Sequence, residues 1–304
     1  MTTKCINAAI EMMDEYGLEK AILINPPAPE AGRSEQKEAA VRAIAETRPD
    51  RFYYGAGGNV LNAIIEGAGD TRPVDSDVSD DFEATLQGLV ATGGFVSFGE
   101  MCALHLSLEP GHAFEDTPPN SPLFLRLAAV AAAEGVPLDI HIDVVETTMD
   151  TPDFFLDASS SNPDELQGNV DEFEELLTSN RNARIVLAHV GRDTTGDMSV
   201  DLMDRLLDAH SNLYIQIVPA AGPLFTDNAI LDSNRVVRDE WLTLLETYRD
   251  RVVLGSDVFF SPPDAARRDL RRMQLFLQQL PEDLAYEIGC TNAVEIYRLS
   301  DGCE

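Results

Sequence analysis

Four side chains of types that bind metal ions stand at the ends of short apolar runs in this chain, which holds only five histidines. They are Glu100 after residues 94–99, His141 after 136–140, His189 after 184–188 and Asp257 after 252–256. Imidazole and carboxylate together are a donor set that suits Zn²⁺, and also Mn²⁺, Fe²⁺ or Co²⁺. The pattern therefore predicts a site for one divalent metal, with zinc first among the candidates.

The same residues suggest roles in catalysis. Asp257 can bind the metal or act as a general base on water, and His189 can stabilise developing charge. Asp143 lies two residues after His141, so both side chains project to the same side of a strand. We expect Asp143 to contact substrate. A lone histidine in an apolar run is more often a buried structural residue. Here two histidines, His141 and His189, end neighbouring predicted strands, and this repetition favours a polar site.

Three histidines lie outside these runs. His105 and His112 follow Glu100 in a predicted loop, and we expect His105 to contact substrate more than His112. His210 falls at the end of a predicted helix, where a capping role is expected.

The elements that position these residues form a repeating pattern of strands and helices. Short β-branched runs that alternate with helical stretches are typical of parallel strands in an α/β protein. Seven strands are predicted at 20–25, 51–55, 94–99, 137–143, 184–190, 212–218 and 251–257. Helices are predicted at 6–16, 34–47, 79–91, 122–134, 163–179, 199–210 and 236–248. Metal ligands at the carboxyl ends of successive strands indicate a TIM-type (β/α)₈ barrel whose first strand is missing, in a single domain over 1–304.

Several motifs, in this order along the chain, resemble the amidohydrolase superfamily, in its branch of amidohydrolase-related metal-dependent hydrolases. They are Gly99-Glu100, Ile140-His141, residues 186–191 (Val-Leu-Ala-His-Val-Gly) and residues 254–257 (Leu-Gly-Ser-Asp). The resemblance implies that His141 and His189 correspond to the later-strand metal histidines, and Asp257 to the last-strand aspartate. It also implies a first strand ending in His-x-His. No histidine precedes His105, so either an upstream segment is lacking or this member is degenerate.

Three functions follow as hypotheses. The first is a metal-dependent hydrolase that uses metal-activated water on a small amide, ester or lactone. The second is a metal-dependent decarboxylase or lyase that acts on a carboxylic acid. The third is a degenerate, non-catalytic barrel without metal, motivated by the absent His-x-His.

Composition narrows the possible partners to small molecules. The net charge is −31, from 53 acidic and 22 basic side chains, which repels nucleic acid and anionic membrane surfaces. No apolar run is long enough to span a bilayer, and no signal peptide is visible, so a cytoplasmic location is expected. The four cysteines form neither a Cys-x-x-Cys pair nor a dense disulfide framework. A barrel that lacks one strand has exposed edges, which predicts a helper segment or a homodimer.

Overall fold

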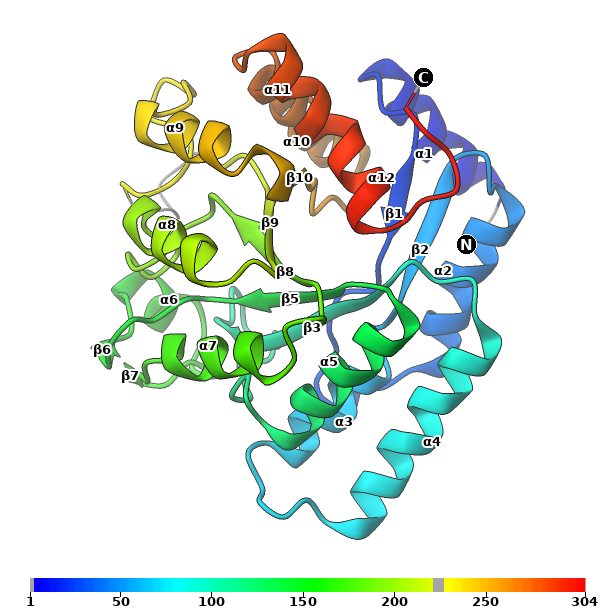
Figure 1. The fold of residues 1–304 in the computed structure, drawn as a ribbon, viewed down its shortest axis with the longest axis vertical. Coiled ribbons are helices and arrows are strands. Elements are labelled where there is room, and N and C mark those ends of the chain that lie inside the picture. Colours follow the sequence, from blue (N-terminus) through cyan, green and yellow to red (C-terminus); the bar gives the residue numbers. More distant parts are fainter. Residues whose placement is uncertain (1–2, 221–226, 304) are drawn as a thin grey trace.

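The computed structural model describes residues 3–220 and 227–303. Its main feature is a sheet of seven parallel strands in the order β1-β2-β3-β5-β8-β9-β10, with β4 antiparallel beside β3 (Figure 1). These strands are β1 Ala21–Leu23, β2 Phe52–Gly57, β3 Ser97–His105, β4 Glu115–Asp116, β5 Leu138–Ile142, β8 Ile185–Val190, β9 Leu213–Ile217 and β10 Val252–Leu254. A separate two-stranded sheet pairs β6 (Met149–Asp150) with β7 (Glu165–Leu166). All seven predicted parallel strands are present.

Helices connect the strands and cover the outside of the sheet (Figure 1). They are α1 Thr3–Glu15, α2 Glu35–Thr47, α3 Leu61–Ala68, α4 Ser76–Thr92, α5 Pro122–Glu134, α6 Asp153–Ala158, α7 Val170–Ser179, α8 Val200–Ala209, α9 Asp239–Thr247, α10 Pro263–Leu277, α11 Glu282–Tyr286 and α12 Asn292–Ile296. Short 3₁₀ segments occupy Glu30–Gly32 and Arg249–Arg251, and a π-helical turn spans Glu287–Thr291. None of the described helices is long and apolar enough to cross a membrane.

The sheet is an incomplete barrel. Each parallel strand pairs with its neighbours in sequence order, but β1 and β10 are the outer strands, and the described residues contain no further parallel strand between them. This confirms the predicted TIM-type architecture with one strand missing. Outside the gap, α1 packs against α10 through Met12, Ala266 and Leu270, all nearly inaccessible to solvent. The edge between β1 and β10 is therefore covered from outside by helices, while the predicted homodimer stays a prediction.

Local signals explain where several helices begin and end. Ser34 accepts a hydrogen bond from the backbone N–H of Lys37 and caps α2. Pro122 is the first residue of α5, and Gly135 ends that helix with φ 72°, a left-handed conformation that glycine adopts without steric cost. The α5 bounds agree with the prediction residue by residue.

Three predictions of local structure were wrong. The helix expected from residue 163 begins only at Val170, because residues 165–166 form β7, and the Asn162 side chain bonds to Ser107 and Phe155 instead of capping a helix. The helix expected from residue 236 begins at Asp239, because residue 237 bridges to residue 231. The third strand does not end at Gly99 but continues to His105.

The amino ends of the strands form a closed floor, in which the Tyr297 hydroxyl donates to the buried carboxylate of Asp139 at 2.7 Å. Val186, Val253, Ile296 and Tyr297 pack together there and are at most 4% exposed, which places α12 beneath the barrel interior. The chain then runs back from α12 beside β1 and β2 (Figure 1).

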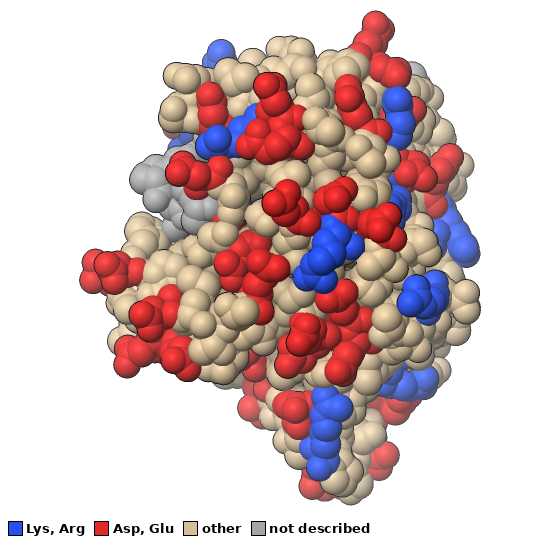
Figure 2. All heavy atoms as spheres, turned by 60° about the vertical axis from the view of Figure 1, so that its left-hand side comes forward, with Lys and Arg blue, Asp and Glu red and all other residues tan. Residues whose placement is uncertain are grey.

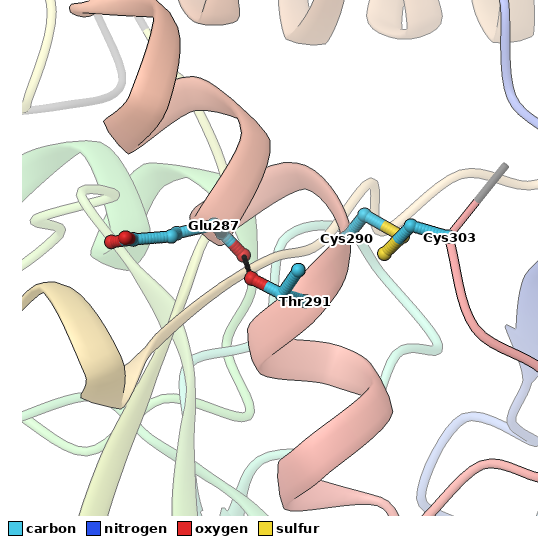
Figure 3. The surroundings of a disulfide bond; sticks show 4 residues. All are labelled: Glu287, Cys290, Thr291 and Cys303. Carbon is cyan, nitrogen blue, oxygen red and sulfur yellow. Dashed lines mark hydrogen bonds between the residues drawn. A yellow bond between two sulfur atoms is a disulfide. The ribbon is translucent and has the colours of Figure 1, made fainter.

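Two kinds of contact hold this C-terminal tail. A disulfide joins Cys290 to Cys303 (Figure 3). In addition, the carboxylate of Asp301 pairs with Lys20 and accepts a hydrogen bond from the Tyr53 hydroxyl at 3.1 Å. Lys20 directly precedes β1, and Tyr53 belongs to β2. The tail thus links the helices that follow β10 to the opposite edge of the sheet.

Acidic side chains are spread over the surface rather than gathered on one element. Figure 2 shows them across the visible face, where they outnumber the basic ones. This distribution agrees with the sequence, in which acidic residues occur along the whole chain.

Candidate metal centre

Three of the predicted ligands come together at one point inside the open barrel. Glu100 in β3 places its Oε1 3.4 Å from His141 Nδ1 in β5 and 3.6 Å from His189 Nε2 in β8. The three strands are adjacent in the sheet, so neighbouring strands supply all three donors. Candidate ligand atoms of these residues lie within 4.8 Å of one another. The structure therefore brings three of the four candidate residues together, while their role as ligands stays a prediction.

The fourth predicted residue lies beside this cluster of three rather than within it. Asp257 follows β10, and its Oδ1 lies 3.8 Å from His189 Nε2. Its side chain is 30% exposed, against 9% for His141 and 13% for His189. Asp257 is thus the member of the set that solvent reaches most easily, which suits a group that exchanges protons.

Two of these residues have an unusual backbone. His189 has φ 60° and Asp257 has φ 46°, both in the left-handed region that residues other than glycine rarely adopt. Gly191 follows with φ 94°, and a Cβ there would lie 2.9 Å from the Ile230 side chain. Such conformations cost free energy and tend to cluster at functional sites. The strain here turns His189 and Asp257 toward the cluster.

His141 is the most buried of the candidate ligands, and the carboxylates of Glu100 and Asp143 both lie near its ring. Burial alone would lower its pKa, but interactions with Asp143 and Glu100 outweigh burial and raise the pKa to about 10. Asp143 shows the reverse balance: burial would raise its pKa, but the interaction with His141, whose Nε2 lies 3.8 Å from Asp143 Oδ2, outweighs that effect and lowers it. The Nε2 of His141 is buried and has no hydrogen-bond partner among the described residues.

His189 has the opposite electrostatic character. Burial lowers its pKa to about 3, and its Nδ1 lies only 2.9 Å from Nδ1 of His141. At that distance the two rings cannot both be charged at a tolerable electrostatic cost. A neutral His189 is in the form that binds metal.

The cluster fits a divalent ion. Two imidazoles and one carboxylate lie within ligand distance of one another, and a second carboxylate adjoins them. Three protein ligands with a fourth position available to water or substrate is the arrangement of catalytic zinc sites. Glu100, His141, His189 and Asp257 are the residues that would hold the ion.

Asp143 and His105, the two residues predicted to bind substrate, lie beside the cluster. The Asp143 Oδ2 accepts a hydrogen bond from the backbone N–H of Leu106 at 2.8 Å, and Oδ1 accepts one from Thr194 Oγ1 at 2.6 Å. Asp143 thus braces His141 and the end of β3. Its contact with substrate stays a prediction.

His105 is the last residue of β3 rather than part of a loop, which corrects the sequence prediction. Its ring centroid lies 4.5 Å from that of His141 and 4.8 Å from that of His112. Burial lowers its pKa to about 3, and its Nδ1 has no partner among the described residues. His210 lies far from this group, at the end of α8, where its Nε2 is 3.1 Å from Glu174 Oε1. Its predicted capping position is confirmed.

Sequence reasoning missed Arg192. This residue lies in the turn after β8, where its backbone N–H donates to the carbonyl of His189, and its Nη1 forms an ion pair with Oδ2 of Asp257. Since Oδ2 of Asp257 faces Arg192, Oδ1 is left facing His189. The sequence feature that could have identified Arg192 is its position three residues after His189, a predicted ligand.

Comparison with known proteins identifies the family of this chain. It belongs to the amidohydrolase family, whose sequence model matches residues 38–299, a range that contains all four site residues. No curated protein matches it.

Several solved structures share the fold. A 2,6-dihydroxybenzoate decarboxylase complexed with 2,6-dihydroxybenzoate aligns with a TM-score of 0.55 at 16% identity, over 96% of this chain and 87% of that one. A putative amidohydrolase from Staphylococcus aureus aligns with a TM-score of 0.53 at 12% identity, over 98% and 92%. A dihydroxybenzoic acid decarboxylase from Polaromonas sp. JS666, with bound manganese and the inhibitor 2-nitroresorcinol, aligns with a TM-score of 0.53 at 14% identity, over 97% and 86%.

Proposed function

We propose that this protein is a metal-dependent hydrolase that acts on a small carbonyl-containing substrate, an amide, ester or lactone. The observation that carries the proposal is the convergence on one point of Glu100 Oε1, His141 Nδ1 and His189 Nε2, with Asp257 Oδ1 beside them. Membership of the amidohydrolase family supports it.

The residues of the cluster have distinct tasks in this proposal. A divalent ion bound there supplies Lewis-acid activation of water and of the substrate carbonyl. Asp257, the most exposed member, accepts the proton from the attacking water at Oδ1 and returns it to the leaving group. His189 and His141 hold their nitrogens toward the same point, and the Asp143 contact keeps the ring of His141 in place.

Zinc is the first choice of metal for this donor set, with Mn²⁺, Fe²⁺ and Co²⁺ as alternatives. The manganese bound to the Polaromonas decarboxylase supports testing Mn²⁺ alongside Zn²⁺. Metal analysis of the purified protein by mass spectrometry identifies the ion.

Decarboxylation of a carboxylic acid is the second candidate. It is favoured by two of the structural neighbours, which are decarboxylases of dihydroxybenzoates. The same cluster would serve it, because a bound ion polarises an acid substrate and Asp257 is placed to deliver a proton to carbon.

One experiment separates these reactions. The metal-loaded protein is incubated with a panel of esters, lactones and amides and with 2,6-dihydroxybenzoate, and both hydrolysis and CO₂ release are measured. Hydrolysis that a chelator abolishes and added metal restores is the expected result. CO₂ release without hydrolysis would replace the first candidate by the second, and a protein that binds no metal and turns over neither class would be the degenerate barrel.

A further inference from the structure

Arg192 stands at the rim of the metal centre with part of its guanidinium unused. Its Nη1 pairs with Asp257, and its side chain is only 20% exposed. Its Nε is buried and has no hydrogen-bond partner among the described residues. A buried donor without an acceptor costs free energy, so the edge formed by Nε and Nη2 is prepared for an acceptor that a ligand could bring.

The surroundings of Arg192 are unusually basic for this protein. Arg272 of α10 is half-buried, burial lowers its pKa, and Arg192, Arg268 and Arg235 are close enough to lower it further. The Arg272 guanidinium contacts the carbonyl oxygen of Pro219, two residues after β9. Segments that follow β8, β9 and β10 therefore bring four arginines to one side of the barrel opening.

This concentration of positive charge is opposite to the character of the whole chain. The molecule carries a net charge of −31, and Asp269 is the carboxylate that pairs with both Arg268 and Arg272. Around Arg192 the four arginines outnumber Asp257 and Asp269, the carboxylates that pair with them, and a local excess of positive charge favours an anion.

We propose that Arg192 forms an anion-binding subsite beside the metal centre, and that the substrate carries a carboxylate held by this guanidinium. A planar guanidinium edge matches a carboxylate in a two-point contact, which favours that group over a neutral one. The statement about substrate rests on the proposed function, whereas the subsite itself does not. It gives Arg192 two contacts, Asp257 at Nη1 and the ligand carboxylate along the Nε edge.

Equilibrium binding tests the subsite without any need for turnover. Benzoate and benzamide have nearly the same shape and differ in charge, and calorimetry measures each against metal-loaded and metal-stripped protein. We expect the wild type to prefer benzoate in both states. Arg192→Met should weaken benzoate binding by about 10–100-fold, leave benzamide within about twofold, and Arg192→Lys should restore part of the difference.

The control is Arg267→Met, which removes the same charge from α10 at a residue paired with Glu15 of α1. It should leave the benzoate preference unchanged. A merely structural role for Arg192 would weaken both ligands equally and overturn the proposal. So would benzoate binding that disappears with the metal and ignores Arg192→Met, because the carboxylate would then sit on the ion. If no substrate is hydrolysed or decarboxylated, the proposed function fails while the binding result still decides the subsite.

Discussion

The amino ends and the carboxyl ends of the strands differ in the residues that surround them. At the amino ends, Val186, Val253, Ile296 and Tyr297 form a floor that is almost free of solvent. At the carboxyl ends, His189 and Asp257 have left-handed backbones, and buried nitrogens of His105, His141 and Arg192 lack partners. The floor contributes stability and the rim contributes chemistry, which is the division of labour found in TIM-type barrels.

The strained backbone and unpaired nitrogens of the metal centre lower the stability of the folded state, and the rest of the fold must offset that loss. Strained backbone and unpaired polar atoms are tolerated only when the surrounding structure is stable enough to hold them. Here His189 lies in β8 and Asp257 directly follows β10, both strands have packed amino ends, and a disulfide ties the chain that follows β10. Changes at the rim should therefore alter activity more than stability, and changes at the floor should do the reverse.

The largest effect is expected for His189→Ala. The change removes a direct metal ligand, so both bound metal and turnover should fall by more than the ~100-fold that loss of a supporting residue can cost. Metal content by mass spectrometry and turnover in the substrate panel are the measurements. His210→Ala is the matched control and should change neither; full metal content in His189→Ala would show that the ring is not a ligand.

Asp257→Asn should separate metal binding from proton transfer. The amide keeps the shape and an oxygen near His189 but cannot carry the proton, so turnover should fall by ~10²–10⁴-fold while most of the metal remains. The metal-to-protein ratio is measured on the same sample as the rate. An unchanged rate would remove Asp257 from the mechanism.

Away from the metal centre, Cys303→Ser should change the stability of the protein without changing its metal content. The disulfide closes a loop between residues 13 positions apart, and its loss should lower the free energy of unfolding by about 2–3 kcal/mol. Urea denaturation measures the change, and Cys5→Ser controls for loss of a thiol. Metal content should be unchanged; a variant that loses metal would break the proposed separation between floor and rim.

The smallest effect concerns Glu66 of α3, near the rim strand β4. Burial, followed by repulsion from Glu115, raises the pKa of Glu66 from 4.5 to about 8. A raised pKa contributes stability that is fully present below about pH 4.5 and is lost as the pH rises through 8. Glu66→Gln removes this dependence, so the variant should gain stability relative to wild type as the pH rises from 5.5 to 8.5. Parallel stability curves for the two proteins would contradict the assignment.

The sequence predicted the elements whose signals are local. Apolar β-branched runs located all seven parallel strands, and Pro122 and Gly135 located both ends of α5. The proximity of the four candidate residues could be predicted because strand order alone brings the carboxyl ends of parallel strands together. No distances were needed for that inference.

The features that were missed depend on contacts between distant residues. Nothing local shows that β3 runs past Glu100 to His105, since its extension depends on pairing with β4 and β5. Asn162-Pro163 has the signature of a helix start, but tertiary bonds to Ser107 occupy the Asn162 side chain. The Arg192–Asp257 pair and the Cys290–Cys303 disulfide likewise become visible only once the chain is folded.

The contact between Lys20 and Asp301 also sets an order of events during synthesis. The two residues are 281 positions apart, so at ~5–20 residues per second the ribosome makes Asp301 on the order of 15–60 s after Lys20. Throughout that interval the outer edge of β1 has no tail beside it, and an open strand edge can pair with another chain. The nascent protein is thus exposed to aggregation at this edge until Asp301 has been made.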